Sequence, residues 1–425
     1  MINDESLVAV AGADFTPHFM RPLYDTYSFA QLPQTVRCLL TGETRKGVPF
    51  GPRDDLYADY DTVILFFVDA FGWHFFEQVA ERHPFLKRIV DEGLVCKLTS
   101  QFPSTTAAHV TTIHTGQPVG QSGIYEWYYY EPLLDALIAP LLFSYAGDAE
   151  RNTLAASGVP AAALYPTHTL YHELSQHGVQ SFVFQDHHYA RSPYTETVTS
   201  GATIVPYRTL TEGIVNLLAH AAQQTSRAYY VLYVDSIDAI CHLYGPDSPQ
   251  VAAEIQTFLS IMEILFHPTL SKTQRRTLFL MTADHGQTAI DPATTVYLNQ
   301  SMPEILRLLK TNGRGQPLVP AGSARDLFLH VEDEHLAEAQ TTLQEHLQGT
   351  AEVHRVDALI DAGFFGSAPP SAAFRSRVGN LVILPYEHAS VWWYEQGRFA
   401  QSFYGSHGGL TRAEMETLLL AQAYG

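Results

Sequence analysis

The chain has 425 residues, 25 of them basic and 44 acidic, so its formal net charge at pH 7 is −19. This excess of acid excludes a general nucleic-acid or anionic-membrane surface, because both need clustered positive charge. It does not exclude a small anionic substrate, since bound cations would dominate the local field. The length favours a main domain that carries a smaller inserted one.

The N-terminus and the cysteines give expectations about the cellular compartment. Residues 1–15 have no basic segment and no long apolar core, and no apolar run approaches the length of a membrane span. We therefore expect no secretory signal and no membrane anchor. Cys38, Cys96 and Cys241 are too widely spaced for a CxxC zinc motif or a disulfide framework. These features predict a cytoplasmic protein, and they carry no indication of its oligomeric state.

Apolar runs and helical periodicity alternate over the first 295 residues. Strand patterns occupy residues 61–69, 94–99, 179–184, 229–235 and 277–284. Helix patterns occupy residues 31–40, 72–92, 106–116, 169–178, 210–224 and 250–266. Continuous apolar strands between helices are typical of a parallel sheet buried on both faces. The fold class is therefore predicted to be α/β, with a doubly wound, mostly parallel central sheet and helices on both faces.

Residues 296–375 change in character and predict a small α+β insert or cap. Strand patterns at 325–331 and 351–356 flank a helix over 334–348, and the segment ends in the flexible run GSAPPSAAF. The catalytic core would then comprise residues 1–295 and 376–425.

The segment after the insert returns to the pattern of the core. Strands are expected over 378–385 and 390–394, followed by a glycine-rich loop over 404–410. A C-terminal helix is expected over Thr411–Ala423.

Three of the predicted strands end in an acid: Asp69, Asp235 and Asp284. In open α/β sheets, ligands gather at the carboxyl ends of the strands. Three buried carboxylates there would repel one another unless cations neutralised them. The alternative, in which each acid only caps a helix, suits one such acid better than three that are accompanied by histidines.

Histidines near these acids predict a metal site. Asp238 and His242 are four residues apart and share one face of a helical turn, so both can reach one ion. Asp284 and His285 are adjacent in ADHG, and His407 lies in GSHGGL, where glycines allow close approach. A set of oxygen and imidazole ligands without thiolates suits zinc, with manganese or iron as substitutes.

A hydroxyl-rich segment, FPSTTAAHVTTIHTG, turns from loop to helix at Ser104, Thr105 and Thr106. A hydroxyl at this place lies at the positive end of the helix dipole, next to unpaired N–H groups, which suits a phosphate or an alkoxide. Taken alone, an N-cap is the more frequent explanation of such a segment. The acids and histidines elsewhere in the chain favour a nucleophile.

Five motifs in order resemble those of the alkaline phosphatase superfamily: VILFFVDAFG, FPSTTAAHVTTIHTG, VDSIDAICHLYGP, FLMTADHG and YGSHGGL. The resemblance is greatest to the type I phosphodiesterase/nucleotide pyrophosphatase branch, with phosphonoacetate hydrolase as a near relative. The motifs extend from Asp69 to His407, which is most of the chain. The resemblance implies an alkaline phosphatase-like core and two divalent metal ions, usually zinc.

The resemblance also implies roles for individual residues. One metal would be held by Asp238, His242 and His407, and the other by Asp69, Asp284 and His285. Thr106 would be the nucleophile and would also contact the second metal. Thr105 or Ser104 would take this role if the motif were displaced by one or two residues.

Some positions depart from the family pattern or carry no fixed role. Phosphodiesterases often have an asparagine three residues after the nucleophile, whereas this chain has His109 at that position. His109 could donate a hydrogen bond to phosphate, or it could be a packed helix histidine. Asp235 is expected to support the metal ligands. Phe71 would line the substrate pocket. An aromatic group could stack on a nucleobase or pack in the core: Tyr125, Trp127, Tyr128, Tyr129 and Tyr130.

These features predict a metal-dependent hydrolase that cleaves phosphodiester or pyrophosphate bonds of small, nucleotide-like substrates through a phosphothreonine intermediate. No nucleic-acid polymer or membrane is expected as a partner. The alternatives are a phosphomonoesterase or phosphonate hydrolase of the same superfamily, and an inactive binding protein on this fold. A sulfatase is disfavoured because the chain has no CxPxR-like segment. A cofactor-independent phosphoglycerate mutase is disfavoured because that enzyme would use a serine as its nucleophile.

Overall fold

A seven-stranded sheet forms the centre of the molecule, described from a computed structural model over residues 1–44 and 47–425. The strand order is β2-β17-β9-β1-β8-β6-β7. The strands are β1 (Thr62–Val68), β2 (Leu94–Thr99), β6 (Gln180–Asp186), β7 (Thr203–Tyr207), β8 (Ala228–Val234), β9 (Thr277–Thr282) and β17 (Glu416–Tyr424). Only β17 runs antiparallel to its neighbours within this sheet. The predicted doubly wound, mostly parallel α/β fold is confirmed.

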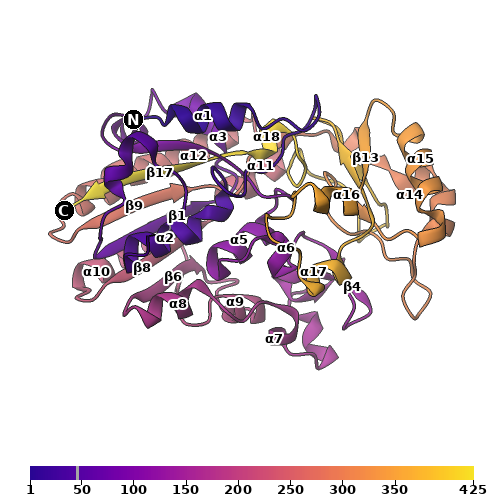
Figure 1. Ribbon diagram of the computed structural model, residues 1–425, viewed down its shortest axis with the longest axis horizontal. Helices are drawn as coiled ribbons and strands as arrows, with labels where there is room; N and C mark the ends of the chain where they lie inside the picture. Colours follow the sequence, from indigo (N-terminus) through magenta and orange to yellow (C-terminus); the bar gives the residue numbers. More distant parts are fainter. Residues whose placement is uncertain (45–46) are drawn as a thin grey trace.

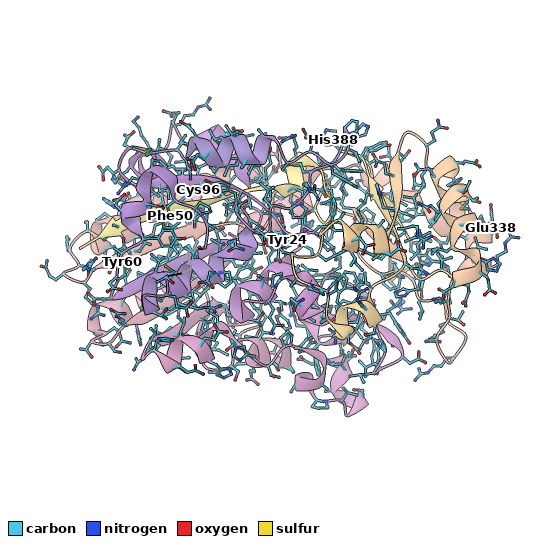
Figure 2. The ribbon with its side chains drawn as sticks, viewed as in Figure 1. Tyr24, Phe50, Tyr60, Cys96, Glu338 and His388 are labelled. Atoms are coloured by element: carbon cyan, nitrogen blue, oxygen red, sulfur yellow. The ribbon has the colours of Figure 1, made fainter. Side chains whose placement is uncertain are left out.

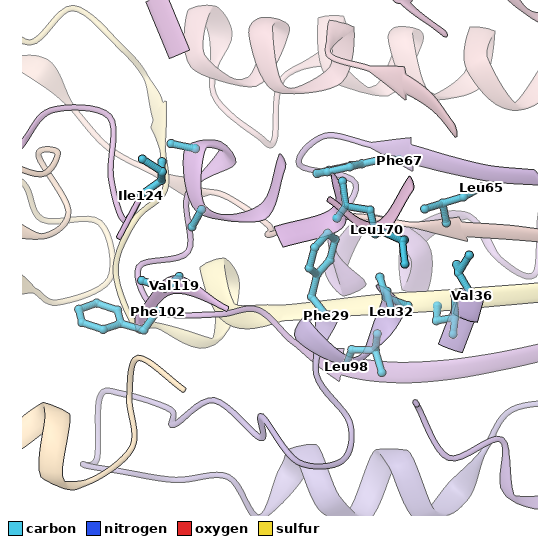
Figure 3. Packing of buried hydrophobic residues seen from close by; sticks show 14 of the residues in the cluster. Phe29, Leu32, Val36, Leu65, Phe67, Leu98, Phe102, Val119, Ile124 and Leu170 are labelled. Atoms are coloured by element: carbon cyan, nitrogen blue, oxygen red, sulfur yellow. The ribbon is translucent and has the colours of Figure 1, made fainter. Parts of the chain in front are cut away.

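Helices cover both faces of the sheet (Figure 1). One face carries α2 (Leu32–Thr41), α5 (Thr106–Thr115) and α8 (Leu170–Gln176), and the other carries α3 (Trp73–Val79), α4 (Pro84–Glu92), α10 (Leu210–Gln223) and α12 (Pro249–Ile261). Strand β1 is buried throughout, and its side chains alternate between the two layers. Leu65 and Phe67 pack against Leu32 and Val36 on the first face (Figure 3), whereas Phe66 packs on the second.

The helix expected over residues 72–92 is divided in two. Helix α3 ends at Val79 and α4 begins at Pro84. A proline has no N–H and disfavours helical backbone in the residue before it, so it is tolerated only in the first turn. The His83 side chain accepts a hydrogen bond from the Phe85 N–H and caps the second helix.

The prediction of a C-terminal helix over Thr411–Ala423 is wrong. Only the short α18 (Arg412–Met415) is helical, and β17 follows it and lies between β2 and β9. Leu419 faces one core cluster, and Leu418 and Leu420 face the other. A continuous apolar run is buried on both sides in such a strand, whereas a surface helix would bury only one side.

A three-stranded antiparallel sheet in the order β12-β14-β13 forms within and just after the segment predicted to be an insert. Its strands are β12 (Leu327–Leu329), β13 (Ala351–Arg355) and β14 (Leu381–Pro385), and α15 (Leu336–His346) packs beside them. Strand β14 follows the boundary expected at residue 375 and pairs with both strands that precede it. The insert lies at the opposite end of the molecule from the two termini (Figure 1), with Glu338 of α15 at its outer edge (Figure 2).

Shorter elements complete the fold. The helices are α1 (Asp4–Ala11), α6 (Val119–Ser122), α7 (Ala161–Leu164), α9 (Pro193–Val198), α11 (Ser236–Tyr244), α13 (His267–Leu270), α14 (Leu298–Ser301), α16 (Val356–Asp361) and α17 (Ala372–Arg377). The strands are β3 (Tyr129–Glu131), β4 (Ala136–Ala139), β5 (Ser144–Tyr145), β10 (Thr288–Ala289), β11 (Val296–Tyr297), β15 (Val391–Trp392) and β16 (Gly405–Ser406). None of the helices in the described ranges is both long and apolar enough to cross a membrane.

The position of β17 predicts a large stability effect from one leucine. Leu419 is fully buried between β2 and β9, so Leu419→Ala should lower the free energy of unfolding by about 2–5 kcal/mol. Ala423→Ser, at an exposed position of the same strand, should change it by less than about 0.5 kcal/mol. Urea unfolding followed by circular dichroism measures both. Equal, small effects would contradict the placement of this strand inside the sheet.

Candidate metal-binding and catalytic centre

The centre lies at the carboxyl ends of three neighbouring strands. Asp69, Asp235 and Asp284 follow β1, β8 and β9, which are adjacent in the sheet. The loops after β1 and β9 touch, since a Cβ at Gly72 would lie 2.6 Å from the Cα of Gly286. This contact requires glycine and brings Asp69 and Asp284 together.

Asp69, Asp284 and His285 form a first group of ligand atoms, all within 4.8 Å of one another. His285 Nε2 lies 3.2 Å from Asp284 Oδ2 and 3.5 Å from Asp69 Oδ1. All three side chains are buried, and neither of these two carboxylate oxygens has a hydrogen-bond partner among the described residues. Buried polar atoms are nearly always paired, so these two indicate a missing positive partner.

Asp238, His407 and the shared His285 form a second group of ligand atoms within 4.8 Å of one another, and His242 lies beside Asp238. Asp238 and His242 are one turn apart on α11, and His242 Nε2 lies 3.4 Å from Asp238 Oδ2. His407, in the loop after β16, places its Nε2 3.6 Å from Asp238 Oδ1. The His285 ring stacks on the His407 ring with centroids 3.7 Å apart, so it lies between the two groups.

Backbone carbonyls set the tautomers of the three histidines. Nδ1 lies 2.8 Å from the Gly405 carbonyl in His242, 3.1 Å from the Gly286 carbonyl in His285, and 3.0 Å from the Ser104 carbonyl in His407. Because a carbonyl can only accept, each Nδ1 carries the hydrogen and each Nε2 keeps a lone pair that faces the carboxylates. Metal-binding histidines are oriented in this way.

Both groups combine buried carboxylates with neutral imidazoles, and this combination favours the binding of cations. Burial, with repulsion from neighbouring carboxylates, raises the pKa of Asp69, Asp238 and Asp284 well above the usual range. Burial also lowers the pKa of His242 to about 4, so the imidazole is neutral at pH 7. Among ion pairs of the described residues, these acids contact imidazoles and no lysine or arginine. The donor set therefore fits divalent cations.

Thr106 is the candidate hydroxyl that lies at this cluster. It begins helix α5, and its Oγ1 is 3.3 Å from both Asp69 Oδ2 and His285 Nε2. It is partly exposed, whereas Thr105 and Ser104 are buried. The Ser104 hydroxyl instead donates to the Gly409 carbonyl at 2.7 Å. A substrate can therefore reach Thr106 more easily than its two neighbours.

Two cavities meet at the centre, and Thr106, Trp127 and Asp238 line both. Cavity A, of about 220 Å³, has apolar walls that include Phe67, Val110, Leu141, Leu142, Val198 and Val231. Cavity B, of about 420 Å³, has aromatic walls formed by Trp127, Tyr128, Trp392, Phe399 and Phe403.

His109 does not reach either cavity. It is fully buried, its Nε2 accepts a hydrogen bond from the Gln101 N–H at 3.0 Å, and its Nδ1 lies 2.7 Å from the Thr105 carbonyl. Both ring nitrogens are thus used to hold the loop that leads into α5. Of the two interpretations of this residue, the structure favours the packed helix histidine.

The other residues expected to bind substrate are divided between core and cavity. Tyr125 is fully buried against the Tyr129 ring, Phe71 is buried in the core, and neither lines a cavity. Trp127 and Tyr128 of the same aromatic segment do line cavity B. Tyr129 is fully buried like Tyr125, so core and cavity members alternate along this segment, and sequence composition cannot show this.

Three supporting contacts complete the site. The Tyr233 hydroxyl donates to Asp69 Oδ2, and the Gln287 amide donates to Asp238 Oδ1. Asp235 lines cavity A and accepts a hydrogen bond from Tyr189 at 3.0 Å. Sequence reasoning missed Tyr233 and Gln287. Tyr233 lies near the end of β8, two residues before Asp235, and this position is only a weak signal of its role.

Comparisons with known proteins address the family of the chain and its fold. The family model described as Type I phosphodiesterase / nucleotide pyrophosphatase matches residues 63–410. No curated protein matches the sequence.

Two solved structures are similar to the chain. Murine ectonucleotide pyrophosphatase / phosphodiesterase 5 has a TM-score of 0.63 at 15% identity, over 85% of this chain and 87% of that one. Phosphonoacetate hydrolase from Sinorhizobium meliloti 1021, in complex with phosphonoacetate, has a TM-score of 0.59 at 18% identity, over 84% and 89%. At these identities the likeness shows the fold, which is alkaline phosphatase-like as expected.

The hydrogen bond to Asp69 predicts a specific loss of metal affinity. Tyr233→Phe should weaken metal binding by about 10- to 100-fold, because partners that orient a ligand contribute this much. Tyr229→Phe is the matched control, since this hydroxyl on the same strand is buried without a hydrogen-bond partner. Competition with a chromogenic chelator measures both affinities. Equal zinc affinities in the two variants would show that Tyr233 does not support a metal ligand.

Proposed function

We propose that this chain cleaves phosphodiester or pyrophosphate bonds of small, nucleotide-like substrates with Thr106 as nucleophile. The chain belongs to the type I phosphodiesterase/nucleotide pyrophosphatase family and is a phosphoric ester hydrolase. The observation that carries the proposal is the position of the Thr106 hydroxyl. It lies at the N-terminus of α5, where two cavities meet, 3.3 Å from one ligand atom of Asp69 and one of His285.

Two divalent cations fit the donor set, with zinc favoured and manganese or iron as substitutes. Asp69, Asp284, His285 and Thr106 would hold one of them, and Asp238, His242 and His407 the other. The unpartnered carboxylate oxygens and the outward lone pairs of the Nε2 atoms support this assignment. Bound cations supply positive charge that lowers the pKa of a hydroxyl and stabilises charge that develops on phosphate oxygens.

The residues of the chain would carry out the reaction in two displacements. The Thr106 hydroxyl is within 3.3 Å of Asp69 Oδ2, which can accept its proton as the oxygen attacks phosphorus. A bond forms between Oγ1 and phosphorus, the bond to the leaving alcohol or phosphate breaks, and a phosphothreonine remains. Water then displaces Oγ1 from phosphorus, the threonine hydroxyl regains a proton, and the phosphoryl product leaves.

The start of α5 would bind the phosphate itself. Thr105 occupies the N-cap position without a capping hydrogen bond from its side chain to the first turn. The first backbone N–H groups of α5 therefore remain free to donate to phosphate oxygens, and the helix dipole favours negative charge there. This binding mode does not need the donor that phosphodiesterases often place at the position of His109.

The two cavities favour a diester over a monoester. A phosphodiester carries two organic groups on phosphorus, and cavities A and B both open at Thr106. The aromatic rings of cavity B suit a flat group such as a nucleobase, which stacks on aromatic side chains. Cavity A suits a second, more apolar substituent.

Removal of the nucleophile should abolish turnover and leave the metal site in place. Thr106→Ala should reduce phosphoesterase activity to background, while the zinc content equals that of the wild type, because the carboxylates and imidazoles remain. Thr106→Ser keeps the hydroxyl and should retain measurable activity. Steady-state assays and elemental analysis of the three proteins provide the test. Wild-type rates in Thr106→Ala would mean that another group attacks phosphorus.

Substrate preference separates the candidate functions. With zinc or manganese present, we expect bis-p-nitrophenyl phosphate to be hydrolysed with a higher kcat/KM than p-nitrophenyl phosphate, because a monoester leaves one cavity empty. A chelator should stop the reaction, and added metal should restore it. The reverse order of substrates would favour the phosphomonoesterase or phosphonate hydrolase alternative. Turnover of neither ester by the metal-loaded protein would favour a binding protein on this fold.

A further inference from the structure

A second pair of buried carboxyls lies outside the centre described above. Glu126 precedes β3 and Asp326 precedes β12, yet the two side chains meet in the interior and neither is exposed. Glu126 Oε1 and Asp326 Oδ2 have no hydrogen-bond partner among the described residues. Asp69 and Asp284 show the same combination of facing carboxyls and unpartnered oxygens in the candidate metal centre.

Neither acid of this pair has a cationic partner. Arg325 is adjacent and buried, but its Nε and Nη2 donate to Glu414 at 3.0 and 2.8 Å, and its Nη1 donates to the Tyr386 carbonyl at 2.8 Å. No ion pair of the described residues includes Glu126 or Asp326. Arg325 therefore balances Glu414, and the pair retains two formal negative charges.

Burial makes these charges unfavourable without a counter-ion. It raises the pKa of Glu126 to about 8, and, with the added repulsion of Glu126, it raises the pKa of Asp326 well above its usual range. A buried carboxylate without a partner loses its hydration and gains nothing in return. The pair must therefore hold either a proton or a cation.

The surrounding oxygen atoms converge at Gly408. A Cβ built on Gly408, whose φ is +126°, would lie 2.6 Å from Ser323 Oγ, 2.9 Å from Asp326 Oδ1 and 3.2 Å from Glu126 Oε1. Three oxygen atoms from two separate chain segments, 323–326 and Glu126, thus surround one small region. Glycine is required there because any side chain would displace them.

We propose that Glu126 and Asp326, together with the Ser323 hydroxyl, bind a third divalent cation, and that this ion is Ca²⁺. A dication balances the two carboxylates. The donors are all oxygen atoms, without the imidazoles of the Thr106 centre, and oxygen-only sites of irregular geometry suit Ca²⁺ better than zinc. The proposal does not depend on the reaction proposed for Thr106.

Such an ion would join the insert to the catalytic loops. Asp326 and Ser323 belong to the segment that enters β12, Gly408 directly follows His407, and Glu126 contacts Thr105 at the start of α5. Glu126 and Ser323 also line cavity B. Bound Ca²⁺ would therefore stabilise the wall of this cavity and raise the stability of the folded chain by mass action.

Calcium retention by the full-length protein tests the proposal. Wild-type protein stripped of metal and reloaded with zinc is mixed with CaCl₂, exchanged into calcium-free buffer and analysed for metal content. We expect about one retained Ca²⁺ per chain and a Ca²⁺-dependent rise in Tm. Glu126→Gln and Asp326→Asn should lose both, with their zinc content unchanged. Asp333→Asn, an exposed acid of the insert, is the matched control and should behave as wild type.

A smaller substitution tests the proposal even if the two carboxylate variants fail to fold. Ser323→Ala keeps both carboxylates and should bind Ca²⁺ more weakly than the wild type. Two results would overturn the proposal. The first is wild-type protein that retains no Ca²⁺ and shows no Ca²⁺-dependent change in Tm. The second is Glu126→Gln protein that retains Ca²⁺ as the wild type does.

Discussion

Repulsion between buried carboxylates is the constraint on which the rest of the site depends. Strands β9, β1 and β8 are neighbours, so Asp69, Asp235 and Asp284 must end at the same edge of the sheet. Parallel pairing fixes their spacing, the lack of a side chain at Gly72 lets the two loops lie against each other, and the Ala70 N–H donates to Asp284 Oδ1 at 3.1 Å across them. Buried acids at this spacing are stable only with added positive charge.

The neighbouring groups are arranged for that positive charge. Backbone carbonyls hold the three imidazoles with Nε2 turned towards the acids, and Tyr233 fixes one carboxylate oxygen of Asp69. The N-terminus of α5 brings a hydroxyl and free N–H groups to the same place. The proposed metal ligands, nucleophile and phosphate-binding groups thus come from separate segments that the sheet edge holds together.

Much of the fold could be predicted because buried parallel strands have a strong local pattern. The runs that end in Asp69 and Asp284 are buried throughout and mostly apolar, so their positions and their terminal acids could be identified directly. The segment 416–424 also contains an apolar run, but its pairing with β2 and β9 joins residues more than 100 positions apart. A local pattern cannot distinguish such a strand from a buried helix, and the C-terminal prediction failed for this reason.

In the candidate site, too, features that depend on local motifs could be predicted, and features that depend on packing between distant segments could not. The acids and histidines could be proposed because ordered motifs carry them. The buried position of His109 and the separation of Tyr125 from Trp127 depend on packing against distant segments. Gln287 and Tyr233 were missed because a supporting hydrogen bond needs only one polar atom at the right place, and many residue types provide it.

Diffraction from zinc-loaded crystals, recorded on both sides of the zinc absorption edge, tests the central claim most directly. We expect two anomalous peaks beside the Thr106 hydroxyl, one among Asp69, Asp284 and His285 and the other among Asp238, His242 and His407. A crystal in which these six side chains surround no anomalous density, although zinc is present in excess, would contradict the claim that cations hold this cluster together.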